Sequence, residues 1–422
     1  MTVGTTLTQP GVIDIALTDL RYERHFGPGK ASLARMLGTV VEVSSEGAWI
    51  TAADGRRYLD FGGYGVFILG HRHPRVVQAV KEQIDTHPLA TRVFLEPVAA
   101  AAAEALASVT PGDLDLVHFV NSGAEATEAA LKLARAHGRN AVVTTRRGFH
   151  GKTIGALSVT ANPKYQTPFA PLLPGITEVE YGDADAIRQA LAAHPGRGCV
   201  IVEPVQGEGG VRIPPRGYLT AVAQACKEYD ALLVVDEIQT GLGRLGTWWG
   251  CDSEGVVPDI LLVGKGLSGG VVPAAAMVAR QEVYLPFGRD PILHSSTFGA
   301  SPLACAAALA AVETIRDEGI VQRSAELGAH LLAEIRAIVT RRAPSLILEV
   351  RGRGLLIGIE PADQRYVGEL LLEFIERGVL INHSLNASEV LRFTPPATLR
   401  DDEIDLFLQT VDAALAAVAE RA

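Results

Sequence analysis

Cysteine is scarce in this 422-residue sequence. Only Cys199, Cys226, Cys251 and Cys305 are present, and no two of them have the C-x-x-C spacing of a redox or zinc motif. A disulfide framework is disfavoured, because such frameworks serve small secreted domains that lack a large core. We interpret all four as small buried apolar residues with reduced thiols, as expected in the cytoplasm, and we predict no metal site.

Clustered positive charge and long apolar runs are also lacking. The formal net charge is −10 and the basic residues are scattered, which argues against a nucleic-acid or anionic-membrane partner. No uncharged apolar run is long enough to span a bilayer, and the N-terminus lacks the basic start and apolar block of a signal peptide. We therefore expect a cytoplasmic protein whose partners are small molecules, with a loosely held arm over about the first 20 residues.

Apolar residues, by contrast, make up 48% of the chain, and its length predicts two or three domains. Between residues 115 and 280, short apolar runs alternate with helical patterns such as 125–137 and 219–229. Strands buried on both faces have continuous apolar runs, so this alternation predicts an α/β fold with a mostly parallel, doubly wound sheet. The predicted strands are 116–120, 141–145, 200–202, 232–235, 260–263 and 274–279.

The two ends of the chain predict a second, smaller α+β domain. Asp54-Gly55 is a hairpin-turn signal between alternating segments, and "LILEVRGRGLLIGIE" contains two strand-like runs joined by a glycine-rich turn. Long helices are predicted at 302–315 and near 401–418. We assign an N-terminal arm and part of the small domain to residues 1–60, a large cofactor-binding domain to 61–315, and a C-terminal small domain to 316–422.

The stretch "LLVVDEIQTGLGRLG", residues 232–246, contains a G-x-G-x-x-G pattern. That pattern cradles a dinucleotide only when it directly follows a strand and opens a helix. Here DEIQT separates the strand from the first glycine, and a tryptophan pair follows instead of an amphipathic helix. We interpret the match as chance and expect the chemistry of this stretch to lie in DEIQT.

Polar and glycine-rich residues follow three of the predicted strands, where ligand sites of such sheets lie. Ser122 and Gly123 open a helix whose free N–H groups suit a phosphate, although this segment alone favours an ordinary N-cap by Ser122. Asp236 follows the strand predicted at 232–235, and Lys265 follows the strand predicted at 260–263. Burial removes the charge of a lysine and makes its amine a good nucleophile. These residues supply an amine that can form an imine, a carboxylate that can pair with a ring nitrogen, and a site for a phosphate. Together they predict a pyridoxal phosphate (PLP) site.

From about residue 39 to 418 the sequence resembles the class III aminotransferases, which are PLP enzymes of fold type I. The motifs that carry the resemblance are "LGHRHPRVVQAV", "NSGAEATEAALKLAR", "FHGKTIGALSVT", "VIVEPVQGEGGV", "LLVVDEIQTGLGRLG", "PDILLVGKGL", "STFGASPLACAAAL" and "VLRFTPP". Within the family, "FGGYGVFILGHRHP", "FHGK" and "PFAPLLPG" resemble the putrescine aminotransferase branch.

The resemblance implies that Lys265 and Asp236 are catalytic. Lys265 carries the cofactor on its amine and moves a proton between the substrate Cα and the cofactor, while Asp236 keeps the ring nitrogen protonated. Gly123 and Ala124 offer N–H groups to the phosphate, and Thr297 reaches the phosphate of the neighbouring subunit in an obligate homodimer. The implied cofactor-binding residues are Ser122, Gly123, Ala124, Thr297, Phe149 and Ile238 on the two ring faces, Gln239 at the ring oxygen, and His150.

For the substrate, the resemblance implies that Glu208 pairs with Arg392 and releases it to bind the carboxylate of glutamate or 2-oxoglutarate. Tyr64 and Lys152 are further implied substrate contacts. Many relatives have an arginine at the position of Lys152 to clamp a second carboxylate, and a lysine cannot form the same fork. Two further departures, "GGVVPAAA" and "FGAS", fall near the expected active-site entrance.

We therefore predict an ω-aminotransferase that moves a terminal amino group of a diamine such as putrescine to 2-oxoglutarate by a ping-pong mechanism. The alternatives are amination of a long-chain or carrier-bound aldehyde in a biosynthetic pathway, with a carrier protein as a further partner, and an ornithine, acetylornithine or 4-aminobutyrate type of aminotransferase. A PLP-binding protein without turnover is disfavoured by the intact Lys265, Asp236 and Arg392. A racemase or mutase on the same fold would turn over one substrate without an acceptor.

Overall fold

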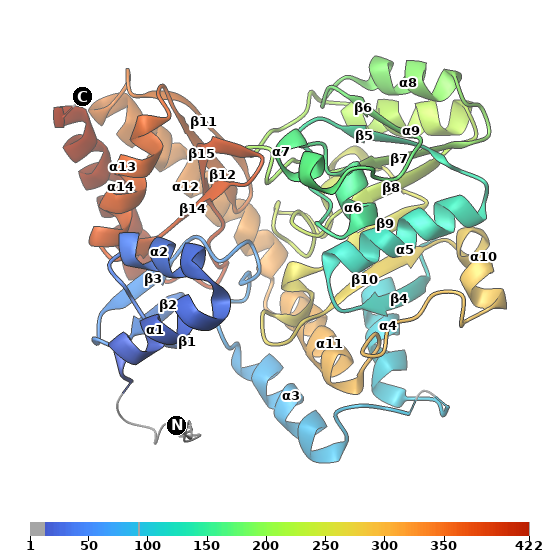
Figure 1. Ribbon diagram of the computed structural model, residues 1–422, viewed down its shortest axis with the longest axis horizontal. Coiled ribbons are helices and arrows are strands. Elements are labelled where there is room, and N and C mark those ends of the chain that lie inside the picture. Colours follow the sequence, from blue (N-terminus) through green and yellow to red (C-terminus); the bar gives the residue numbers. More distant parts are fainter. Residues whose placement is uncertain (1–12, 92, 422) are drawn as a thin grey trace.

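The centre of the computed structural model, which describes residues 13–91 and 93–421, is a seven-stranded sheet with the order β4-β10-β9-β8-β7-β5-β6 (Figure 1). Neighbouring strands from β6 across to β9 are parallel, whereas β10 is antiparallel to both β9 and β4. The predicted mostly parallel sheet is therefore confirmed. Its strands are β4 (Leu116–Val120), β5 (Ala141–Thr145), β6 (Ile176–Val179), β7 (Gly198–Val202), β8 (Leu232–Asp236), β9 (Ile260–Val263) and β10 (Ala275–Ala279).

Apolar side chains cover both faces of this sheet. Val234 and Leu262 pack in a core with the helix α5, whereas their neighbours Val235 and Leu261 belong to the core on the opposite face, with α4, α9 and α11. This alternation explains why β9, and β8 up to Asp236, are unbroken apolar runs. The helices of this part are α3 (Pro74–Thr86), α4 (Pro97–Ala107), α5 (Gly123–Ala136), α6 (Ile154–Val159), α7 (Pro163–Gln166), α8 (Ala184–Ala192), α9 (Tyr218–Glu228), α10 (Gln281–Arg289) and α11 (Pro302–Asp317), with 3-10 turns at Thr167–Phe169, Gly250–Glu254 and Lys265–Ser268.

Segments from both ends of the chain form the smaller α+β part, as predicted (Figure 1). The C-terminal β13 (Val379–Leu380) pairs in parallel with the N-terminal β3 (Arg57–Asp60), which continues the hairpin of β1 (Glu42–Glu46) and β2 (Trp49–Ala52). A second sheet has the order β11-β12-β15-β14. Its strands are β11 (Ile347–Arg353), β12 (Leu356–Pro361), β14 (Asn382–Ser384) and β15 (Ala387–Phe393), and the helices are α12 (Ile320–Arg342), α13 (Arg365–Glu376) and α14 (Asp401–Arg421). The boundaries at residues 60 and 315 stay predictions.

The loosely held arm expected over about the first 20 residues stays a prediction, because no residue of the helix described within it is buried. Residues 1–12 lie outside the described part, but α1 (Ile15–Phe26) and α2 (Pro28–Met36) follow directly. The carboxylate of Asp14 accepts the Leu17 N–H at 2.9 Å, so an N-cap that the sequence analysis overlooked starts the helix.

The G-x-G-x-x-G stretch forms turns and opens no helix, which confirms that the match is chance. Its arginine, Arg244, is buried and donates to the backbone carbonyls of Gly65 and Pro395. The stretch therefore ties the large sheet to segments from both ends of the chain.

Two further expectations concern the cysteine thiols and membrane-spanning helices. All four cysteines are buried and free, as predicted. Among residues 13–91 and 93–421, no helix combines the length and apolarity that crossing a membrane requires.

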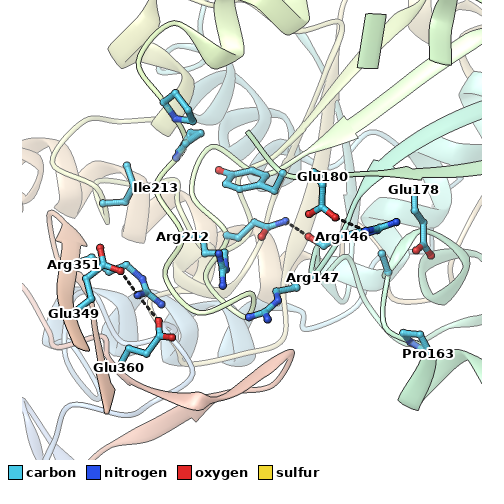
Figure 2. A pocket seen from close by; sticks show the side chains of 15 residues that line it. Arg146, Arg147, Pro163, Glu178, Glu180, Arg212, Ile213, Glu349, Arg351 and Glu360 are labelled. Carbon is cyan, nitrogen blue, oxygen red and sulfur yellow. Dashed lines mark hydrogen bonds and ion pairs between the residues drawn. The ribbon is translucent and has the colours of Figure 1, made fainter. Parts of the chain in front are cut away.

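A cavity of about 800 Å³ lies between the edge of the central sheet and the second sheet (Figure 2). Residues from β6, β11 and β12 line it, together with the segment that follows β5. It is separate from the smaller cavity at the strand ends described next.

Candidate active site

The predicted site residues converge on a cavity of about 250 Å³ at the carboxyl ends of β7, β8 and β9. This is where parallel sheets hold their ligands. The predicted residues that line it are Gly123, Ala124, Phe149, His150, Glu208, Asp236, Ile238, Gln239 and Lys265.

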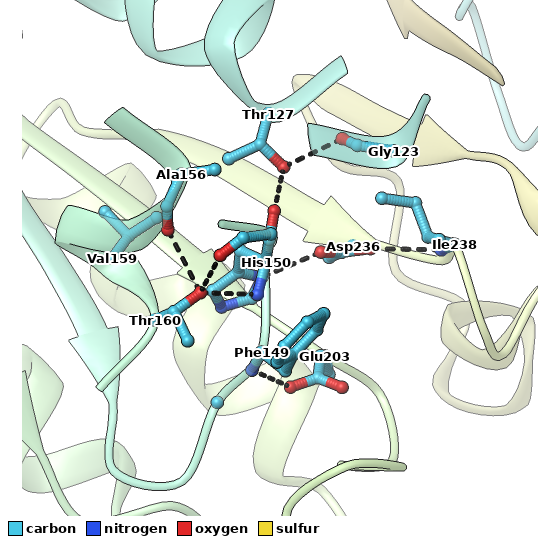
Figure 3. A network of polar contacts seen from close by, with 12 residues as sticks. Gly123, Thr127, Phe149, His150, Ala156, Val159, Thr160, Glu203, Asp236 and Ile238 are labelled. Carbon is cyan, nitrogen blue, oxygen red and sulfur yellow. Dashed lines mark hydrogen bonds and ion pairs between the residues drawn. The ribbon is translucent and has the colours of Figure 1, made fainter. Parts of the chain in front are cut away.

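Asp236, the last residue of β8, is fixed by two hydrogen bonds (Figure 3). One carboxylate oxygen accepts the Ile238 N–H at 3.0 Å, and the other lies 2.7 Å from Nδ1 of His150. Burial opposes protonation of His150, but its hydrogen bond to Asp236 and the charges of Asp236 and Glu203 raise the pKa of His150 overall. His150 therefore donates from Nδ1 to the Asp236 carboxylate.

Backbone contacts hold His150 in turn. Its N–H donates to the Thr160 hydroxyl at 2.9 Å, and its carbonyl accepts the Thr127 hydroxyl at 2.8 Å (Figure 3). Since Thr127 lies on α5, the network links Asp236 to the helix that begins at the predicted phosphate site.

Lys265 directly follows Gly264 at the end of β9 and has a left-handed backbone with φ of 44°. A non-glycine residue in this region is strained, and such strain concentrates at functional sites. Burial lowers the pKa of Lys265, and Arg392 contributes in the same direction. The structure thus favours a neutral, nucleophilic amine.

The start of α5 offers free N–H groups beside the cavity. The Ser122 hydroxyl caps the helix through the Glu125 N–H at 3.3 Å, and Ser122 lines an adjoining cavity together with Lys265. A Cβ atom at Gly123 would lie 2.7 Å from Cδ1 of Ile238. Only glycine therefore lets the start of the helix approach the Ile238 side chain so closely.

Glu208 and Arg392 form a buried ion pair, with side-chain exposures of 5% and 1%. Burial alone would raise the pKa of Glu208, but the charges of Arg392 and Lys265 outweigh it and lower this pKa. Glu208 also accepts the Leu385 N–H at 2.9 Å. The site therefore favours the ionised form of the Glu208 carboxylate beside Arg392.

Three predicted residues lie away from the cavity. Thr297 is exposed, which is compatible with the implied role at a neighbouring subunit's site. Tyr64 is 62% exposed and has a φ of 53°. Lys152 is exposed and its ammonium lies 4.1 Å from the ring centroid of Tyr165, so it is held by a cation–π contact outside the cavity lining.

The chain matches the family model "Aminotransferase class-III" over residues 33–415. The chain belongs to the class III aminotransferases. Among solved structures it is similar to the ornithine aminotransferase from Toxoplasma gondii ME49, with 34% identity, a TM-score of 0.86, and coverage of 93% of this chain and 95% of that one. It is also similar to an (S)-enantioselective omega-transaminase from Thermomicrobium roseum, with 29% identity, a TM-score of 0.88, and coverage of 97% and 100%. An amine transaminase from an uncultivated Pseudomonas species, in its PLP-bound form, shares 30% identity, with a TM-score of 0.81 and coverage of 90% and 95%.

This aminotransferase is a PLP-dependent enzyme of fold type I. The residues present fit that cofactor. Both polar atoms of the buried Gln239 amide and Nε2 of His150 have no hydrogen-bond partner among residues 13–91 and 93–421. Unpaired buried polar groups are costly, so these atoms await a polar ligand.

Besides Gly151, the sequence analysis missed one lining residue of the aminotransferase site, Glu203. It follows β7 just as Asp236 ends β8, and its carboxylate accepts the Phe149 N–H at 3.0 Å (Figure 3). Burial, the largest cause, raises the pKa of Glu203 to about 7, although the charge of His150 opposes the rise. Asp236 and Lys265 were selected because ligand sites lie at the carboxyl ends of parallel strands, and the same criterion would have selected Glu203.

Proposed function

We propose that this aminotransferase transfers a terminal amino group of a diamine such as putrescine to 2-oxoglutarate in a ping-pong cycle. The observation that carries the proposal is the buried Glu208–Arg392 pair beside Lys265. An arginine that can be covered or uncovered suits an enzyme that binds a substrate without a carboxylate and one with a carboxylate in turn.

The chain's own residues supply the proton transfers and the binding. Lys265, with its lowered pKa, accepts a proton from the substrate carbon that bears the amine and returns it later in the cycle. PLP, when bound, supplies an electron sink for the developing carbanion. Asp236, hydrogen-bonded to His150, would keep a proton on the ring nitrogen of the cofactor. Phe149 and Ile238 would confine the cofactor ring, and Gln239 would donate to its oxygen.

The carboxylate substrate depends on Arg392. When a 2-oxo acid binds, its carboxylate replaces that of Glu208 on the guanidinium, and Glu208 remains hydrogen-bonded to the Leu385 N–H. When an amine without that carboxylate binds, Glu208 covers Arg392 again, so no buried charge is left unpaired.

Lys152 favours an amine donor with no second carboxylate. Its ammonium is engaged with the Tyr165 ring, and a single ammonium cannot form the two parallel hydrogen bonds by which an arginine holds a carboxylate. Ornithine is the second candidate donor, because the Toxoplasma gondii relative, at 34% identity, is an ornithine aminotransferase.

A single-turnover experiment distinguishes the donors. The PLP-loaded enzyme is mixed separately with putrescine, cadaverine, ornithine, 4-aminobutyrate and a long-chain primary amine, and loss of the cofactor absorbance is followed. We expect rapid loss with the two diamines. Faster loss with ornithine would replace the diamine proposal by the ornithine type, and faster loss with the long-chain amine would favour amination of a long-chain or carrier-bound aldehyde.

The assembly that we propose is a homodimer whose active sites lie at the interface. Thr297, exposed in the single chain, would then reach the phosphate site of the partner. Large apolar side chains are exposed on two segments, including Phe94 at 80% and Ile292 at 86%, and exposed apolar groups of this size mark an association surface.

A further inference from the structure

The 800 Å³ cavity contains four arginines and four glutamates, and we name it the arginine cleft (Figure 2). Its charged lining residues are Arg146, Arg147, Arg212, Arg351, Glu178, Glu180, Glu349 and Glu360. Its volume lies within the range of about 300–1,000 Å³ that is typical of small-molecule sites. The cleft takes no part in the cofactor chemistry, because it shares no lining residue with the cofactor cavity.

Three of the four arginines already have a carboxylate partner. Arg146 pairs with Glu180, Arg147 pairs with Glu389 at 2.9 Å, and Arg351 reaches Glu349 and Glu360, both at 2.6 Å. These ion pairs hold three guanidinium groups around the cleft. In Figure 2, two of these arginines, Arg147 and Arg351, lie on either side of Arg212.

Arg212 is the exception. Among residues 13–91 and 93–421 it makes no ion pair, and its one side-chain hydrogen bond is from Nε to the Gly209 carbonyl at 3.3 Å. Partial burial, and then the charges of Arg147 and Arg351, lower the pKa of Arg212. The charges of Glu360 and Glu389 oppose this shift, but neither carboxylate is hydrogen-bonded to Arg212, so its remaining N–H groups are available to a bound anion.

The backbone connects Arg212 with the active site. Gln206 and Arg212 exchange two backbone hydrogen bonds, at 3.0 and 3.1 Å, and so close a short loop that carries Glu208 at its far end. Arg351 donates to the carbonyls of Gly210 and Val211 on the same loop. Val211 has a φ of 51°, a strained conformation for a β-branched residue, so the loop is held in shape by these contacts.

We propose that the arginine cleft binds a small anion carrying phosphate or carboxylate groups, with Arg212 as its main ligand, and that the 206–212 loop transmits its occupancy to the Glu208–Arg392 pair. The fork of a guanidinium matches either group bidentately. A bound anion draws Arg212, and with it the loop that positions Glu208, so it changes how readily Arg392 is uncovered.

The binding part is tested on the PLP-loaded enzyme by calorimetric titration with inorganic phosphate and, separately, citrate at constant ionic strength. We expect one site for at least one of the two anions, weakened tenfold or more by Arg212→Gln and less by Arg212→Lys. The matched control is Arg216→Gln, four positions along the chain, exposed and outside the cleft, which should bind as the wild type does. Absence of binding to the wild type, or equal weakening by Arg216→Gln, would overturn the proposal.

A second variant tests the same site if Arg212→Gln fails to fold. Glu178 is exposed, lines the cleft and has no ion-pair partner in the described part of the chain. Glu178→Gln removes a repelling carboxylate and should tighten binding of the same anion. Unchanged or weaker binding would count against a site in this cleft.

The transmission part rests on the proposed role of Arg392, whereas the binding part does not, so the two can fail separately. Saturating anion should change the KM for 2-oxoglutarate at least twofold in the wild type and in Arg216→Gln, but not in Arg212→Gln. The same KM change in Arg212→Gln would mean that the anion acts at Arg392 itself, and the proposed transmission would be wrong.

Discussion

Lys265 combines a strained backbone with a buried amine whose pKa is lowered. We predict that Lys265→Ala lowers turnover by at least about 10⁴-fold, since it removes both the covalent attachment and the proton carrier. Borohydride reduction followed by mass spectrometry should detect covalently attached cofactor in the wild type and none in the variant. Turnover near the wild-type rate would refute the assignment of Lys265.

In the proposed mechanism, Arg392 binds substrate in only one of the two half-reactions. We predict that Arg392→Gln raises the KM for 2-oxoglutarate about 10- to 100-fold, the effect of one charged hydrogen-bonded contact, and changes the diamine half-reaction less than threefold. Stopped-flow measurement of each half-reaction separates the two. Arg365→Gln, at an exposed site, is the control. Equal damage to both halves would contradict the switch between Glu208 and Arg392.

Glu203 gives the stability a defined pH dependence. Burial raises its pKa to about 7, so the folded chain keeps this proton while the unfolded chain releases it near the ordinary pKa of 4.5. The free energy of unfolding therefore falls by on the order of 3 kcal/mol as the pH rises from about 4.5 to 7.

We predict that Glu203→Gln removes this loss of stability, because the amide can still accept the Phe149 N–H but does not titrate. Chemical unfolding of the cofactor-free protein at intervals from pH 5 to 8 measures the difference. The exposed Glu420→Gln should keep the wild-type slope. A slope in Glu203→Gln as steep as that of the wild type would show that other groups cause it.

At the scale of elements, the position of Gly123 at the start of α5 leaves no room for a larger side chain. We predict that Gly123→Ala displaces Ile238, whose Cδ1 would lie 2.7 Å from the new Cβ, and weakens cofactor retention about tenfold or more. Equilibrium dialysis against PLP measures the loss. Gly368→Ala in α13 is the matched control, because no atom lies within 4 Å of its Cβ position, and it should stabilise that helix by about 0.5–1 kcal/mol. Equal PLP affinity in both variants would exclude a close approach at Gly123.

The elements also show what a sequence can predict. Strands buried on both faces leave continuous apolar runs, so β8 and β9 and the polar residues at their ends could be located before the structure was known. The pairing of His150 with Asp236 could not, because it joins residues 86 positions apart through the order of the strands. Helix α1 was missed because none of its residues is buried, so no apolar stripe marks it.

At the scale of the whole molecule, two exposed segments indicate association. Val93, Phe94 and Leu95 are at least 80% exposed, and Ile292 and Phe298 are exposed at 86% and 59%. Monomers rarely leave so many large apolar side chains in water. We predict that the enzyme sediments as a dimer, which analytical ultracentrifugation measures at several concentrations. A concentration-independent monomer would contradict the proposed interface.

Shared active sites would have a sharper consequence, because Lys265 and Thr297 of one site would then come from different chains. Thr297→Asp places a carboxylate beside the partner's phosphate site and should inactivate the homodimer by repelling PLP, while Lys265→Ala inactivates it by removing the amine. In a mixed dimer, the site with Lys265 from the Thr297→Asp chain receives Thr297 from the Lys265→Ala chain and is complete. Denaturing and refolding the two inactive variants together should therefore restore up to about a quarter of wild-type activity, since half of random dimers are mixed and each has one intact site. No recovery, with mixed dimers verified by two affinity tags, would mean that Thr297 serves the site of its own chain or no site.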